Sequence, residues 1–270
     1  MSEDRSEERA RTAANGSTVN ELVLSDTAEY ALRLGDDALI LSQRLSEWSA
    51  RSPQIEEDIA LMNIALDLLG QARSLLSYAG GEAGRSEDEL AYLREERQFR
   101  NVQLAELDNG DFAATQVRQL LFSGYQCQLY RELQDSTDPQ LAAIAGKAIK
   151  EVSYHLEHSV AWVCRLGDGT DFSHDRTQFA LDEVWPYTHD LFVDDPVFER
   201  VAAAGIGPLP SSLRDGWQAA VLPVLTEATL TVPTDGWRPT GGRQGMHTQS
   251  FGYLLAELQH LHRSHPGAQW

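Results

Sequence analysis

Residues 53–79 place the strongest constraint on the fold, because they are apolar on nearly every side when wound as a helix. One stripe recurs at alternating spacings of four and three residues: Ile55, Ile59, Met62, Leu66 and Leu69. Leu61, Ile64 and Leu68 extend the apolar surface round much of the remainder. We expect the stripe to be the buried face. A helix with so much apolar surface must be surrounded by other helices, which predicts a bundle.

The ends of this helix carry capping signals. Ser52 suits an N-cap, Pro53 suits the first helical position, and Gly80-Gly81 predicts the C-terminus. Three further long helices are expected at about 25–49, 111–133 and 138–167, with N-caps at Ser25 or Asp26, Asp111 and Asp138. Shorter helices are expected at 87–99, 170–192, 196–204, 211–229 and around 251–261. No segment has the pattern of a strand.

These elements predict an all-α protein built on a long four-helix bundle. The bundle core is expected at about 25–167, and additional C-terminal helices at about 170–270. Residues 1–23 are polar and aperiodic, which predicts a disordered tail. No linker or internal repeat divides the rest, so we expect residues 24–270 to form a single domain.

Composition excludes several classes of function. The net charge is −19, from 41 acidic and 22 basic residues, and this charge would be repelled by nucleic acids and anionic membranes. The N-terminus has no apolar signal segment, and no uninterrupted apolar run reaches the roughly 18 residues that span a bilayer. Cys127 and Cys164 lie far apart in apolar pattern, which is typical of unpaired thiols in a reducing compartment. We therefore expect a cytoplasmic protein.

Helical bundles often hold two metal ions, and the sequence can be compared with their usual ligand set. That set is one Glu from each of two helices and a Glu-x-x-His from each of the other two. The second helix has Asp67 followed by Gly70, and the segment 112–131 of the third has no carboxylate. The fourth has Glu151 with its histidine one position late, at His155. Because one residue turns a helix by about 100°, this histidine cannot replace the missing ligand.

We therefore assign no catalytic, cofactor-binding or metal-ligating residue. Polar side chains in apolar helical context are expected to form a structural network where a metal pair would lie, with these candidates: Asp36, Asn63, Asp67, Arg118, Lys150, Glu151 and His155. Asp37 is the alternative to Asp36 as the inward-facing carboxylate of the first helix. The glycines Gly241-Gly242 indicate a turn, and Arg238 and Arg243 beside it make this a candidate contact loop.

Three alternatives stay open at this point. The first is a self-sufficient di-metal enzyme with atypical ligands drawn from Asp36, Asp67, Glu151 and His155. The second is a single metal bound by His155 and His158. The third is a ligand-binding bundle whose central network holds a small acid or a coenzyme A tail.

Seven segments resemble the C subunits of ring-1,2-phenylacetyl-CoA epoxidases. They are LGDDALILSQRLSEW (34–48), EEDIALMNIALDLLGQARSLLSYAG (56–80), EERQFRN (95–101), NGDFAATQVRQLLF (109–122), IKEVSYHLEHS (149–159), RLGDGTDFSH (165–174) and GGRQGMHTQSFGYLLAELQHLHRSHPGAQW (241–270). The resemblance covers nearly everything after the expected tail, in order and without large gaps.

The resemblance implies a ferritin-like fold and a place in a multicomponent oxygenase of aerobic phenylacetate breakdown. It implies a non-catalytic companion of a homologous A subunit, which carries the di-iron centre. It further implies a bridging B subunit and a reductase that draws electrons from NADPH. No ligand role carries over to this chain, because the matching positions do not hold metal ligands.

Overall fold

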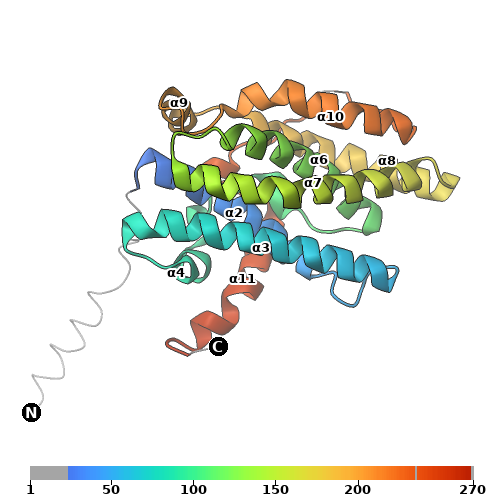
Figure 1. Cartoon of the computed structure of the whole chain (residues 1–270). Helices are drawn as coiled ribbons and strands as arrows, with labels where there is room; N and C mark the ends of the chain where they lie inside the picture. The colour runs from blue at the N-terminus through green and yellow to red at the C-terminus, as the bar shows by residue number, and fades with distance from the viewer. Residues whose placement is uncertain (1–23, 235, 269–270) are drawn as a thin grey trace, which may run out of the picture.

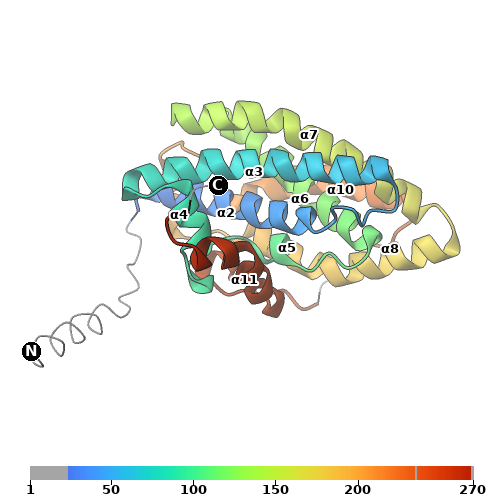
Figure 2. The ribbon, with the colours of Figure 1, turned by 90° about the horizontal axis from the view of Figure 1, so that it is seen from below.

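The computed structural model describes residues 24–234 and 236–268, and within these ranges the chain contains helices and no strand. Four long helices lie side by side and form the body of the molecule (Figures 1 and 2). The prediction of an all-α fold with a long four-helix bundle is confirmed. The expected tail, residues 1–23, lies outside the described residues.

Two helical hairpins make the bundle. Helix α2 (Asp26–Ser46) packs along α3 (Ile55–Ala83), and α6 (Phe112–Leu133) packs along α7 (Pro139–Gly167). Helices α3 and α7 then lie against each other and bring the two hairpins together (Figure 2). This is the arrangement of a ferritin-like bundle.

Local capping explains where three of these helices begin. The side chain of Ser25 accepts a hydrogen bond from the backbone N–H of Ala28, and that of Asp111 accepts one from Ala114. Asp138 accepts from two backbone N–H groups of the first turn of α7. Each cap satisfies donors that have no partner inside the helix. The three predicted N-caps are therefore confirmed.

The rest of the chain covers the bundle. The expected helix at 87–99 is shorter, because α4 (Glu87–Tyr92) is followed by the 3-10 turn η1 (Glu96–Gln98) and by the short helix α5 (Gln103–Glu106). The C-terminal elements are α8 (Asp171–Val184), η2 (Trp185–Phe192), α9 (Pro196–Ala203), η3 (Pro210–Leu213), α10 (Arg214–Glu227), η4 (Gly242–Gln244) and α11 (Gln249–Ser264). Helices α8 and α10 pack on α6 and α7, whereas α11 crosses beneath α2 and contacts α4 (Figure 2).

The expected orientation of α3 is wrong. Leu61, Ile64 and Leu68 are completely buried. The stripe expected to be buried instead faces outward, with exposed fractions of 72% for Ile55, 57% for Ile59, 64% for Leu66 and 38% for Leu69. Helix α3 has two apolar faces, and α2 covers only the one that carries Leu61, Ile64 and Leu68. The outward face is called the α3 stripe below: Ile55, Ile59, Met62, Leu66 and Leu69.

The predicted ends of α3 are also wrong. The helix begins at Ile55, after Gln54 and not after Ser52. It continues through Gly80 and Gly81 to Ala83, and its left-handed C-cap is Gly84, at φ 64° and ψ 33°. Gly80 is needed for a different reason: a Cβ there would lie 2.3 Å from the carbonyl oxygen of Arg85, in the turn that follows.

Helix α3 is long and apolar enough to cross a membrane by length and composition alone. The averaged criterion tolerates polar residues, whereas the sequence has no uninterrupted apolar run of that length, because Asn63 and Asp67 interrupt it. Half of the most apolar window of α3 is buried inside the protein, as in the core helix of a water-exposed bundle. The length of α3 is thus weak evidence for a membrane span.

We predict that alanine substitutions at Gly81 and Gly84 have opposite effects on stability. Gly81→Ala should raise the free energy of unfolding by up to about 1 kcal/mol, because alanine favours a helix and a Cβ at Gly81 meets no atom within 4 Å. Gly84→Ala should lower it by about 1 kcal/mol, because Gly84 has a positive φ. Urea unfolding of both variants beside the wild type measures the difference. Equal shifts in the same direction would contradict the observed end of α3.

Candidate functional site

The seven side chains expected to form one polar network lie in separate places. Asn63 and Lys150 are exposed to solvent. Asp67 and His155 form one pair between α3 and α7, with Glu151 close by, whereas Arg118 lies under the turn between α5 and α6. Asp36 belongs to a third cluster, with Arg94 of the segment that follows α4. The structure therefore has three separate polar groups where the sequence predicted one central network.

Asp36 and Asp37 both point inward, and each binds a different arginine. The carboxylate of Asp36 is completely buried and forms a two-pronged ion pair with Arg94, whose Nη1 lies 2.9 Å from Oδ2. Asp36 also accepts a hydrogen bond of 2.8 Å from the backbone N–H of Arg100. The guanidinium of Arg94 lies 4.1 Å from the ring centroid of Phe99, so it is held on both sides. This pair fastens the segment after α4 to α2.

Asp37 binds Arg243 in the same two-pronged manner. The Nη2–Oδ2 and Nη1–Oδ1 distances are 2.7 and 3.0 Å, and both side chains are nearly inaccessible to solvent. Burial raises the pKa of Asp37 to about 6, although Arg243 opposes the shift. Burial alone would lower the pKa of Arg243, but Asp37, Tyr125 and Asp190 raise it above its usual range. The prediction that the loop at Gly241-Gly242 presents Arg243 to a partner is therefore wrong.

Further buried carboxylates join segment 94–106 to segment 240–248. Glu106 and His247 are both inaccessible, and Nδ1 of His247 lies 2.7 Å from Oε2 of Glu106. Asn101 donates a 2.7 Å hydrogen bond to the same oxygen. Asp190 accepts from the backbone N–H groups of Gln103 and Gly241, at 3.1 and 2.9 Å. Segments 94–106 and 240–248 are thus bound together and to α2 by buried carboxylates.

The α3–α7 contact carries a smaller polar group. Nε2 of His155 lies 3.1 Å from Oδ2 of Asp67, and Gln71 donates a 3.0 Å hydrogen bond to Glu151. His155 is 1% exposed, and burial lowers its pKa despite the opposing effect of Asp67. Gln71 also accepts a hydrogen bond of 3.2 Å from the hydroxyl of Tyr130. Two of the seven candidates, Asp67 and His155, are thus in contact, whereas Asn63 takes no part in this group.

Arg118 supports a turn and does not pair with Asp67. Its guanidinium donates to the carbonyl oxygen of Leu107 and, at 2.6 Å, to Oδ1 of Asn109. Burial lowers the pKa of Arg118 to about 9. The side-chain amide of Gln116, on the same helix, is buried with neither its oxygen nor its nitrogen hydrogen-bonded within the described structure. Helix α6 therefore presents amides and a cation to the core.

These residues do not fit a di-iron centre. Within residues 24–234 and 236–268, no three His, Cys, Asp or Glu side chains are placed to hold one metal ion. The candidate carboxylates are engaged otherwise: Arg94 binds Asp36, and Gln71 binds Glu151. His158, the other histidine considered as a ligand, lies 2.9 Å from Glu57, which also accepts from Trp162. A di-iron pair needs several carboxylates around one point, and their oxygens here are directed to donors of this chain.

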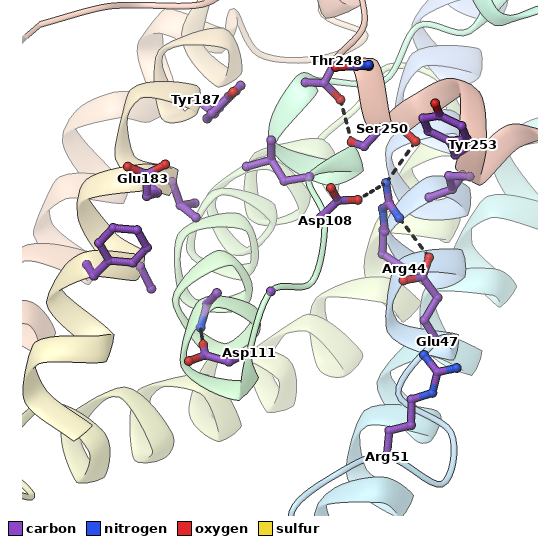
Figure 3. A pocket seen from close by; sticks show the side chains of 18 of the residues that line it. Arg44, Glu47, Arg51, Asp108, Asp111, Glu183, Tyr187, Thr248, Ser250 and Tyr253 are labelled. Atoms are coloured by element: carbon purple, nitrogen blue, oxygen red, sulfur yellow. Dashed lines mark hydrogen bonds and ion pairs between the residues drawn. The ribbon is translucent and has the colours of Figure 1, made fainter. Parts of the chain in front are cut away.

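A separate surface pocket of about 1030 Å³ lies among α2, α8, α11 and the turn before α6. Glu183 and Tyr187 lie on one side of it, and Arg44 and Tyr253 on the other (Figure 3). Arg44 is tied to Glu47 at 3.0 Å and to Asp108 at 3.1 Å. No sequence motif indicates this pocket, because its lining residues come from four distant segments.

Comparison with known proteins agrees with this architecture. The family model described as phenylacetic acid catabolic protein matches residues 11–270. The chain belongs to this family. It is also 48% identical over 248 residues to the C subunit of the 1,2-phenylacetyl-CoA epoxidase of Escherichia coli (strain K12), covering 92% of this chain and 100% of that protein. The resemblance noted from the sequence is confirmed, and it places the chain in phenylacetic acid catabolism.

We predict that Arg243→Met lowers the free energy of unfolding by about 3–5 kcal/mol at pH 8, because it leaves the buried Asp37 carboxylate without its cation. The loss should shrink as the pH falls toward 5. Removing Arg243 raises the folded-state pKa of Asp37 further above about 6, so the folded variant binds a proton at Asp37 more tightly than the folded wild type does. Stability relative to the wild type therefore falls as pH rises through this window. Urea unfolding at pH 5 and pH 8 measures both effects.

Arg263→Met is the matched control for this substitution. Arg263 forms a 3.0 Å ion pair with Glu95, but the two side chains are 37% and 66% exposed. Its loss should cost no more than about 1 kcal/mol at either pH, as for other surface pairs. Similar losses for the two variants would show that the Asp37–Arg243 pair does not hold the C-terminal segment.

Proposed function

We propose that the chain is a structural, non-catalytic subunit of a 1,2-phenylacetyl-CoA epoxidase of aerobic phenylacetate catabolism. In this proposal the chain supports a homologous catalytic A subunit, which holds the di-iron centre, and it carries no cofactor itself. The match to the C subunit of such an epoxidase, over that protein's whole length, supports the assignment. So does the engagement of the candidate carboxylates by side chains of this chain.

The α3 stripe is the observation that carries the proposal. Ile55, Ile59 and Leu66 are each more than half exposed, and they lie on one side of a single helix. Exposed apolar patches of this kind mark interaction sites in soluble proteins. Burying one such side chain contributes about 1.5–3 kcal/mol, so the stripe could supply the centre of a stable interface. A partner bundle that lays a helix along α3 would be held in register by it.

The fixed position of this surface supports the proposed role. The inner face of α3 is locked against α2 through Leu61, Ile64 and Leu68, so the outer face is presented without rearrangement. A preformed apolar face lowers the ordering cost of association. The chain would therefore act as a fixed platform that keeps the helices around the partner's metal site in position.

The proposal includes a cytoplasmic location and the other subunits of the enzyme. A bridging B subunit and a reductase that uses NADPH complete the oxygenase. The net charge of −19 is consistent with a water-exposed protein that binds neither nucleic acid nor anionic membrane.

We predict that the double variant Ile59→Glu/Leu66→Glu no longer co-purifies with the A subunit when the two are co-expressed. Two carboxylates in the apolar centre of the interface should weaken binding by about 100-fold or more, because each would be desolvated without a partner. Both positions are exposed, so the isolated variant should fold normally, as measured by circular dichroism. Ala219→Glu, at an exposed position on α10, is the matched control and should bind like the wild type. Retention of the A subunit by the double variant would refute this interface.

We predict that iron in the co-purified complex belongs to the A subunit. Elemental analysis after the subunits are separated should give about two irons per A subunit and less than about 0.1 per copy of this chain. Oxygen-dependent turnover by this chain alone, or stoichiometric iron bound to it, would show a self-sufficient metalloenzyme instead. Adding excess ferrous iron to the isolated chain should not raise its melting temperature.

A further inference from the structure

The pocket described above has two walls of the same composition. On α8, Phe179 is followed one turn later by Glu183, and on α11, Tyr253 is followed one turn later by Glu257. Residues four apart lie on the same side of a helix, so each wall presents an aromatic ring next to a carboxylate. Phe179 is 66% exposed and Tyr253 is 71% exposed, which is unusual for rings of this size.

Only some of the charged side chains that line the pocket form ion pairs. Five acidic residues and three arginines line it, which gives the lining a net charge of −2. Arg44 holds Glu47 and Asp108, and Arg176 holds Asp111. Within the described part of the chain, the carboxylates of Glu183 and Glu257 have no hydrogen bond or ion pair, although both line the pocket. The two carboxylates without a partner in the described chain therefore lie beside the two exposed aromatic rings.

We propose that this pocket binds a lysine- or arginine-bearing segment of a partner subunit, with an apolar residue beside the cation. Aromatic faces attract cations, and a carboxylate next to each face adds an ion pair. The half-buried Leu107 and Ala114 also line the pocket and offer apolar surface to the neighbouring residue. This inference rests on the proposed function, because it takes the segment from another chain of the same complex.

The shape of the pocket suits a polypeptide segment. It is open to solvent and lies between α8 and α11, with Thr248 at the top of the view and Arg51 at the bottom (Figure 3). The acidic lining would repel a polyanion such as a coenzyme A tail. The exposed side chain of Arg51 also lines the pocket and offers one site for a carboxylate of the same segment. Charge complementarity thus favours a basic partner segment.

The test is a charge reversal in the assembled complex. The chain carrying Glu183→Lys/Glu257→Lys is co-expressed with the other subunits of its epoxidase, and the affinity of each subunit is measured with the purified components. The binding of one subunit should weaken at least about tenfold at roughly 0.15 M salt, and the loss should be larger at lower salt. Asp215→Lys/Glu227→Lys makes the same change in net charge at two exposed positions on α10, and it should leave every affinity unchanged.

A photo-cross-linker identifies the segment. With p-benzoylphenylalanine at position 253 of the otherwise unchanged chain, irradiation of the complex should join it to a peptide of another subunit that carries Lys or Arg beside an apolar residue. Unchanged affinities in the charge-reversed variant would overturn the inference. So would cross-links that form only within the chain or to a segment without a basic residue.

The outcome is separable from that of the proposed function. If the groove binds as described but the substitutions on α3 leave assembly intact, the α3 interface fails and the groove inference stands. If those substitutions abolish assembly and the charge reversal has no effect, the groove inference alone fails. If the wild-type chain assembles with no other subunit, both fail.

Discussion

Two adjacent carboxylates on α2 determine how the rest of the chain is arranged. Successive residues of a helix point about 100° apart, so Asp36 and Asp37 reach different segments from the same turn. Asp36 binds Arg94 and the backbone at Arg100, whereas Asp37 binds Arg243 and the backbone at Val102. One turn of α2 therefore anchors both the connection between the hairpins and the segment that leads into α11. Buried charges are tolerated here because each is matched by a two-pronged arginine and further N–H donors.

Local chemistry made much of the bundle predictable. The N-caps Ser25, Asp111 and Asp138 act through neighbouring backbone groups, so the sequence nearby contains the whole signal. The choice of face on α3 could not be predicted in this way, because both faces are apolar and only the position of α2 decides between them. The pairing of Asp37 with Arg243 also could not be predicted from the sequence. Arg243 lies 206 residues away in the chain, and an arginine in a loop usually suggests an exposed contact. Of the seven polar candidates, the contact of Asp67 with His155 lies in the bundle contact where such residues were expected, whereas the buried ion pairs of α2 were not predicted from the sequence.

Polar side chains are buried along α6 and where it meets α3 and α7. On α6, Gln116, Gln119 and Arg118 lie in the segment that has no carboxylate. Further along α6, the hydroxyl of Ser123 lies 3.5 Å from that of Ser159 on α7, and Gln71 of α3 joins Tyr130 of α6 to Glu151 of α7. Amides and hydroxyls are less costly to bury than carboxylates when they stay neutral. The buried carboxylates Asp36, Asp37 and Glu106 and the half-buried Glu151 each have a hydrogen-bond donor in the same chain.

The outward face of α3 has a consequence for how the cell must handle this chain. Until it is covered, a helix with Ile55, Ile59 and Leu66 in contact with water resembles the surface that chaperones and proteases recognise in unfinished proteins. In the proposed complex, copies made in excess of the partner that covers this face would be bound, degraded or lost to aggregation. Balanced synthesis of the two chains would remove that loss. The exposed stripe would in this way limit the abundance of the subunit to what can be assembled.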